Sequence, residues 1–263
     1  MLSLRAVQAI RDRCAPTAPM TPCPLAKRPS VPPMVRQGMK RYRTRTAAQA
    51  ELVGDDGEQP LDLDACFGRR APRRLEIGFG HGRFLSQMAA SHPAVDFIGV
   101  EHKELRVTKT AHKSLGLDAT NVRLFHDDAQ HFVHHRLPPA SLERVYMLFP
   151  DPWPKRRHRR RRTGNRAFLV DLAHALGAGG RFIFASDTHN YTFQMLTNSS
   201  TMPGVWRNCY GPSGYRMDIP TRFPTVFEVH KKSEGHRIAY LMLERTDAPA
   251  PPKLAIPCKF STL

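Results

Sequence analysis

The sequence of 263 residues is poor in cysteine and in long apolar runs, and each shortage excludes a class of protein. Its five cysteines are scattered and form no Cys-x-x-Cys pair, which argues against a disulfide framework or a structural zinc site and favours a reducing compartment. No apolar run approaches the roughly 18 residues that a membrane-spanning helix needs. We therefore expect a soluble, cytoplasmic protein with no membrane partner.

Histidine does not supply an obvious metal site either. The 13 histidines are dispersed, and only His131, His134 and His135 lie close together in the sequence. No carboxylate or cysteine pattern accompanies them at the spacing of a metal site. We therefore expect no metal.

Acidic residues are scarce relative to basic ones, 23 against 40, and the formal net charge is +17. The excess is concentrated in two places. Residues 1–50 carry ten basic residues against the single Asp12, and residues 154–162 hold seven Lys and Arg in nine positions. The remainder of the chain is close to neutral, as expected of a catalytic domain that binds a polyanion through separate basic segments.

Composition also suggests the domain limits. Residues 1–53 form a basic, proline-rich arm that we expect to be disordered, either a nucleic-acid-binding arm or an organelle transit peptide. Residues 54–246 form one domain, and the proline-rich residues 247–263 form a disordered tail. The oligomeric state is left open between monomer and homodimer.

Within the domain, short apolar strands alternate with helical segments, which is typical of a doubly wound α/β fold with a mostly parallel sheet. An apolar stripe over 168–176 predicts a core helix that ends at the following glycines. The last strand could pair as a hairpin with a strand at Val226–Val229. The other expected strands are Leu75–Ile77, Asp96–Val100, Val122–Phe125, Val145–Phe149, Arg181–Ala185 and Ile238–Leu243.

A glycine-rich turn follows the first strand. Glycines at positions 78, 80 and 82 let a ligand approach the backbone closely, because no Cβ intervenes. The spacing lacks the third glycine of the dinucleotide fingerprint, and Glu76 lies within the strand. A carboxylate there would repel a pyrophosphate and suits a ligand with a cationic amino acid end.

Acidic residues also follow the second and third strands. Glu101 comes 19 residues after Gly82, close to the position at which an acidic residue binds a ribose diol. Asp127 and Asp128 follow the third strand, and Asp128, next to Ala129, is our candidate for accepting the amino group of an adenine. Adenine, ribose and an amino acid tail together describe S-adenosylmethionine.

The run from Pro150 to Arg162 has the composition of a functional site. Two prolines flank Asp151 and restrict its backbone, so a carboxylate is presented at the carboxyl edge of a strand. Trp153 follows and could stack on a base or pack the loop. The cationic residues behind it repel one another and need an anionic partner.

These motifs resemble those of the bacterial tRNA (guanine-N7)-methyltransferase family. Its hallmarks are LEIGxGxG, GxE, DA and PDPWxK, and the sequence has Leu75–Gly82, Gly99–Glu101, Asp128 with Ala129, and Pro150–Lys155. The likeness runs from about Arg74 to Arg245. One departure is Val226, because the family often has lysine there.

The resemblance implies a seven-stranded Rossmann-like methyltransferase sheet with helices on both faces, S-adenosylmethionine as cofactor and the variable-loop guanine, position 46 of tRNA, as substrate. It implies that Asp151 is catalytic. The implied donor-binding residues are Glu76, Gly78, Gly80, Gly82, Glu101, Asp128 and Asp151. The implied substrate-binding residues are Lys155, Asp187, Thr225, Val226, Phe227 and Glu228, with Arg157, His158, Arg159, Arg160, Arg161 and Arg162 on the RNA backbone.

Three alternatives stay open from the residues alone. The chain could methylate a small molecule or a protein, but its cationic segments argue against this. It could be a catalytically silent RNA-binding subunit, against which the retained Glu76, Glu101, Asp128 and Asp151 argue. A dehydrogenase is the most distant alternative, because of Glu76 and the missing glycine.

Overall fold

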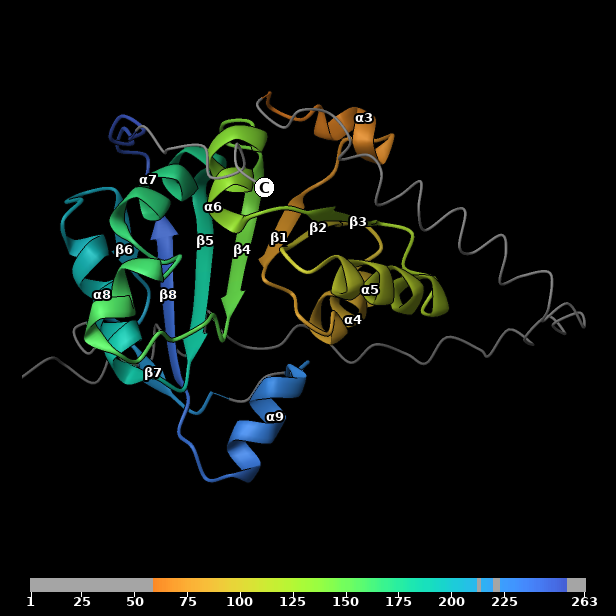
Figure 1. Ribbon diagram of the computed structural model, residues 1–263. Coiled ribbons are helices and arrows are strands. Elements are labelled where there is room, and N and C mark those ends of the chain that lie inside the picture. Colours follow the sequence, from red (N-terminus) through yellow and green to blue (C-terminus); the bar gives the residue numbers. More distant parts are fainter. Residues whose placement is uncertain (1–58, 212–213, 220–222, 255–263) are drawn as a thin grey trace, which may run out of the picture. The chain divides into compact units, whose positions relative to one another are not determined.

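The computed structural model describes residues 59–211, 214–219 and 223–254, which belong to one structural unit. The predicted N-terminal arm, residues 1–53, lies outside the described residues, so both interpretations of it stay predictions. Figure 1 shows a central sheet with helices on either side.

The sheet has eight strands in the described part of the chain, in the order β3-β2-β1-β4-β5-β8-β6, with the two-residue β7 paired to β8. The first five strands are parallel and β8 is antiparallel to β5, so the prediction of a mostly parallel doubly wound α/β sheet is confirmed. Seven strands were expected, whereas the described sheet has eight, and neither β6 nor β7 is among the strands expected from the sequence. The strands are β1 (Arg73–Ile77), β2 (Asp96–Glu101), β3 (Val122–His126), β4 (Leu142–Leu148), β5 (Leu176–Ser186), β6 (Trp206–Asn208), β7 (Arg216–Met217) and β8 (Ala239–Arg245).

Helices cover both faces of the sheet. Two of them, α4 and α5, pack on β2 and β3, while α7 and α8 pack on β5 from the other side (Figure 1). The helices are α3 (Leu63–Phe67), α4 (Arg83–Ser91), α5 (Glu104–Gly116), α6 (Ala129–His131), the π-helix η3 (Phe132–Arg136), the 3₁₀-helix η4 (Arg156–Arg161), α7 (Arg166–Ala175), α8 (His189–Ser200) and α9 (Val226–Ser233).

The strand pattern explains the two layers. Every residue of β2 is buried, as a parallel strand covered on both faces requires. Phe97 packs in the smaller core under α4 and α5, whereas its neighbour Ile98 points to the larger core under α7 and α8. Successive side chains of this strand therefore pack into two separate hydrophobic cores, one on each face of the sheet.

The expected hairpin strand at Val226–Val229 is wrong, because these residues begin α9. Thr225 caps the helix, its Oγ1 accepting the backbone N–H of Glu228 at 2.9 Å. A threonine followed three residues later by glutamate is a helix-start pattern. The β-branched residues suggested a strand, but β7 takes the antiparallel place beside β8 instead.

Two boundaries also differ from the predictions. The core helix ends at Ala175, and Leu176 with the glycines after it already belongs to β5. Part of the tail expected to be disordered contacts the domain, because His174 Nε2 donates to the carbonyl of Pro251 at 2.8 Å and Lys253 Nζ donates to the carbonyl of His134 at 2.6 Å. The ordered domain therefore continues beyond residue 246.

Candidate active site

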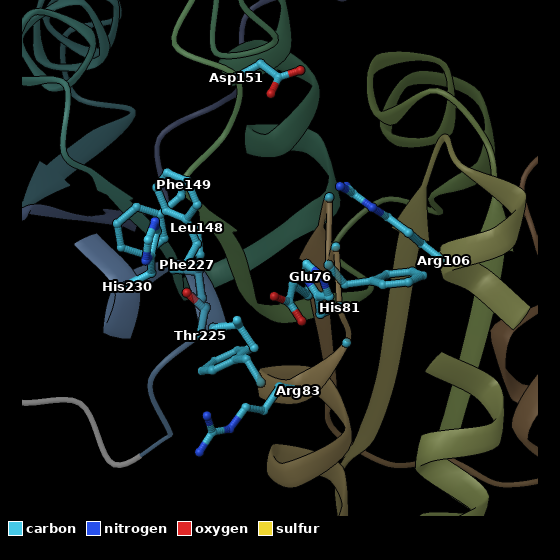
Figure 2. Close-up of a pocket in the computed structure, with 16 residues that line it drawn as sticks. Glu76, His81, Arg83, Arg106, Leu148, Phe149, Asp151, Thr225, Phe227 and His230 are labelled. Carbon is cyan, nitrogen blue, oxygen red and sulfur yellow. The ribbon is translucent and has the colours of Figure 1, made fainter. Parts of the chain in front are cut away.

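A cavity of about 370 Å³ opens at the carboxyl edge of the sheet. Four parts of the chain line it: the end of β1 with the turn to α4, Arg106 of α5, the end of β4 with the loop that follows, and the start of α9. Figure 2 shows Glu76 and His81 between Thr225 and Phe227 on one side and Arg106 on the other, with Asp151 at one end. Glu76, Asp151 and Val226, which are far apart in the sequence, thus line the same cavity.

The glycine turn forms the floor of this cavity. Gly78, Gly80 and Gly82 have φ of 67°, 55° and 65°, a region that residues with a Cβ rarely adopt. Gly82 is also packed tightly, since an added Cβ would lie 2.1 Å from Thr110 Cγ2. Above Gly78 there is open space, so a ligand can reach its backbone.

Glu76 is buried beneath that turn. Its Oε2 atom has no hydrogen-bond partner. Burial raises the pKa of the carboxyl to about 8, although a hydrogen bond from the backbone of Leu85 lowers this pKa in part. An unpartnered carboxyl oxygen aimed at a cavity is costly for the fold. A cationic ligand group would supply the missing partner.

Glu101 holds the turn in place from the end of β2. Its Oε2 accepts the backbone N–H of Gly80 at 3.1 Å, and its Oε1 accepts that of Lys103 at 3.1 Å. His102 Nδ1 lies 2.9 Å from the same carboxylate. Glu101 is therefore adjacent to the turn, but it does not line the cavity itself.

Asp128 stands at the end of β3 and caps α6. Its Oδ1 accepts the backbone N–H groups of Gln130 and His131 at 2.9 and 3.1 Å, which leaves Oδ2 as an acceptor. The neighbouring Asp127 carboxylate accepts the N–H of Asp128 at 2.7 Å and pairs with His131 at 3.0 Å. Asp128 is likewise outside the set of cavity-lining residues.

The loop after β4 is conformationally strained. Phe149 and Trp153 have φ of 54° and 39°, and neither is glycine. Asp151 lies between them, is exposed and lines the cavity. The Phe149 ring meets the Phe227 ring of α9 at 5.1 Å between centroids, so the loop and α9 form one wall.

The cationic segment follows as η4, and most of it is exposed. Lys155 precedes the helix, and Arg157, Arg159 and Arg160 project into solvent. The Arg161 guanidinium lies 5.0 Å from the centroid of the Trp153 ring. Trp153 therefore packs within its own loop here, on the segment that carries the positive charge.

Two predicted RNA or substrate contacts are corrected by the structure. Arg162 is 1 % exposed and hydrogen-bonded inside the protein, so it cannot reach a phosphate as the other arginines can. Glu228 is 3 % exposed, and its Oε1 accepts bonds from Tyr240 Oη and Lys232 Nζ, both at 2.7 Å. Both side chains therefore make hydrogen bonds inside the protein, next to the cavity, and stabilise the segments that line it.

The remaining substrate predictions are near the cavity to different degrees. Thr225, Val226 and Phe227 line it, while Asp187 lies in the turn after β5 and is not among the lining residues. Sequence reasoning missed several residues that do line it: His81, Arg83, Phe84, Arg106 and His230. His81, Arg83 and Phe84 lie within or directly after the glycine motif, which could have indicated them. Arg106 and His230 come from helices whose packing brings them to the cavity.

In the described part of the chain, no three His, Cys, Asp or Glu side chains are placed to hold a metal ion. No described helix is long and apolar enough to cross a membrane.

Comparison with known proteins identifies the family. A family model described as "Putative methyltransferase" matches residues 70–240. A tRNA (guanine-N(7)-)-methyltransferase of Shewanella woodyi is 37% identical over 81% of this chain and 91% of its own length. The chain belongs to the tRNA (guanine-N(7)-)-methyltransferase family.

A second family member, the tRNA (guanine-N(7)-)-methyltransferase of Alkalilimnicola ehrlichii, is also 37% identical, over 73% of this chain and 80% of its own length. Among solved structures, the 16S rRNA methyltransferase KamB matches with a TM-score of 0.51 and 11% identity, covering 74% of this chain and 98% of its own. That likeness supports the methyltransferase fold.

Proposed function

We propose that this protein transfers a methyl group from S-adenosylmethionine to N7 of a guanine in tRNA, the variable-loop guanine at position 46. The observation that carries the proposal is the single cavity shared by Glu76, the glycine turn and Asp151 in a chain of this family. The reaction would take place in the cytoplasm, where tRNA is found.

The residues present fit the methyl donor. The unpartnered Oε2 of Glu76 suits the ammonium of its amino acid end, and the open backbone at Gly78 lets that end lie close. Glu101, which is hydrogen-bonded to the same turn at Gly80, would accept from the ribose hydroxyls. The Oδ2 atom of Asp128 would accept from the adenine amino group.

The donor, when bound, supplies an electrophilic methyl group on a positively charged sulfur. Guanine N7 has an in-plane lone pair and no proton, so the protein needs no general base. Its task is to hold the base with N7 in line with that methyl, which supplies most of the rate enhancement. The β4 loop and α9, which line this end of the cavity and contact each other, would hold the base there.

Asp151 would act on charge. N7-methylated guanine is cationic, and a carboxylate beside the ring stabilises positive charge as it develops. The strained backbone on both sides of Asp151 would fix its position before substrate arrives. Asp187 and Thr225 would orient the edge of the base.

The exposed arginines of η4 would bind tRNA phosphates, with Lys155 nearer the reacting base. Reaching N7 in a folded tRNA requires the base to be turned out or approached from its Hoogsteen edge. A small molecule or a protein substrate would leave these exposed cations without an anionic partner.

The test is methyl transfer from labelled S-adenosylmethionine to bulk unmodified tRNA, with N7-methylguanine mapped by cleavage. We expect label at one guanine, lost at least 100-fold in Asp151→Asn. Asp118→Asn is the matched control, because Asp118 is an exposed carboxylate before β3, at the other edge of the sheet, and asparagine tolerates its φ of 54°.

The negative outcomes separate the alternatives. If the donor binds and no tRNA is labelled, the substrate proposal fails in favour of a small molecule or a protein. If the donor does not bind, the chain is a silent RNA-binding subunit.

A further inference from the structure

Arg162 is the last residue of the cationic run and the one that turns inward. It is 1 % exposed, whereas Arg157, Arg159 and Arg160 are exposed. No carboxylate pairs with it among the described residues. Burying an unpaired charge is unfavourable unless its hydrogen bonds are satisfied, so the surroundings of the guanidinium explain why it is there.

Each nitrogen of the guanidinium has a neutral acceptor. Nε donates to the carbonyl of Pro152 at 2.8 Å, Nη1 to Oε1 of Gln194 at 2.7 Å, and Nη2 to Oδ1 of Asn190 at 2.6 Å. Its carbon lies 4.5 Å from the centroid of the Tyr191 ring. The Arg162 side chain therefore links the β4 loop, through one hydrogen bond, to α8, through two.

Tyr191 makes the anchor rigid. Its ring is fully buried, and its Oη accepts the backbone N–H of Gly164 at 2.9 Å. Gly164 follows Arg162 by two residues, so the backbone just after the arginine is also bonded to α8. Arg162 is thus wedged between a fixed helix and the loop.

What Arg162 holds is the strained part of the β4 loop. Pro152 stands between Asp151 and Trp153, and its carbonyl has no other hydrogen-bond donor in the described structure. The positive φ values of Phe149 and Trp153 persist only when surrounding contacts impose them. The bond from Arg162 is such a contact, next to the Asp151 carboxylate.

We propose that Arg162 is a positioning residue, which fixes the Asp151 carboxylate at the cavity by tying the Pro152 carbonyl to α8. The proposal rests on the proposed function, in which Asp151 stabilises charge on the methylated base. It separates one arginine from its neighbours: those bind RNA, while this one acts through Asp151.

Arginine suits this task better than lysine. Its planar fork presents donors in fixed directions, whereas a lysine ammonium is a point charge on a flexible stem. A methionine of similar length would fill the space beside Tyr191 but donate no hydrogen bond. Arg162→Met and Arg162→Lys therefore form a graded pair of variants.

The kinetic test uses the full-length protein, saturating S-adenosylmethionine and single-turnover conditions. We expect Arg162→Met to lower the methylation rate at saturating tRNA about 100-fold, because a displacement of about 1 Å at the reacting centre has that effect. The Kd for tRNA should change less than threefold. Arg162→Lys should recover part of the lost rate.

Arg160→Met is the matched comparison, since Arg160 is exposed on the same segment. It should raise the Kd for tRNA and lower the slope of log K against log salt by about one. If Arg162→Met behaves in this way and keeps its rate, Arg162 binds phosphate and the proposal is overturned.

A second measurement needs no activity. In a Trp206→Phe background, Trp153 is the remaining tryptophan, and its fluorescence reports the loop. We expect Arg162→Met to raise acrylamide quenching of Trp153 at least twofold in the protein alone, with the circular dichroism unchanged. Unchanged quenching would overturn the proposed anchor.

A milder pair of changes guards against misfolding. Asn190→Ala with Gln194→Ala removes two acceptors from the surface of α8 and leaves Arg162 in place, so it should reproduce part of the rate loss and part of the increase in quenching.

The failure of this proposal can be told from the failure of the proposed function. If Asp151→Asn is inactive and Arg162→Met is not, the positioning proposal alone fails. If Asp151→Asn turns over normally, the proposed role of Asp151 fails whatever Arg162 does.

Discussion

At the scale of a single residue, Glu76 connects stability to binding. Burial raises its folded pKa from 4.5 to about 8, so between these values the folded protein holds a proton that the unfolded chain has lost. Stability of the ligand-free protein therefore falls as pH rises from about 4.5 to 8. The same ionised carboxyl is what a cationic ligand needs.

Glu76→Gln should stabilise the ligand-free protein on the order of 3 kcal/mol at pH 8, a gain that disappears near pH 4.5. It should also weaken S-adenosylmethionine binding, most at high pH. Urea unfolding and calorimetric titration at pH 6 and 8 measure both effects. The exposed Glu104→Gln is the control, expected within about 0.5 kcal/mol of wild type. A Glu76 variant that is less stable at pH 8 would contradict this account.

At the scale of elements, the turn between β1 and α4 is locked against α5 through Gly82 and Thr110. Gly82→Ala should destabilise the protein by about 2–4 kcal/mol, since it adds strain at positive φ to a clash with a buried threonine.

Gly116→Ala is the matched control for that change, because its added Cβ meets nothing within 4 Å and its φ is ordinary. It should stabilise the protein by up to about 1 kcal/mol. Thermal unfolding of both variants checks the pair, and equal effects would refute the packing argument.

The elements also show how far sequence reasoning reaches. Apolar runs located β1 to β5 and β8, because buried parallel strands are continuous hydrophobic stretches. They misplaced α9, since Val226 and Val229 suggest a strand while the capping Thr225 decides the outcome. Arg162 could not be told from its neighbours, because its partners Asn190 and Gln194 come from a later helix.

At the scale of the whole molecule, the RNA binding that we propose for the exposed arginines of η4 would be electrostatic and would therefore depend on salt. Replacing Arg157, Arg159 and Arg160 together by serine should lower the slope of log K against log salt by about two to three units. S-adenosylmethionine affinity should not change. Filter binding from low to high salt checks this.

Arg181→Ser is the control for the charge change, because Arg181 lies in the middle of β5, outside η4, and pairs with Glu244 at 3.2 Å. A slope that falls equally in this control would mean that net charge, rather than the η4 surface, governs tRNA binding.

The strand order has a consequence for synthesis. The last strand, β8, lies between β5 and β6, and β7 pairs with it as well. While a ribosome is still making residues before Ala239, β5 presents an open edge, and β6 and β7 have no strand to join. Open edges invite pairing with other chains. The nascent protein is thus most prone to aggregation just before its final strand emerges, and a chain truncated there would keep α9 but leave β5, β6 and β7 without the strand that joins them.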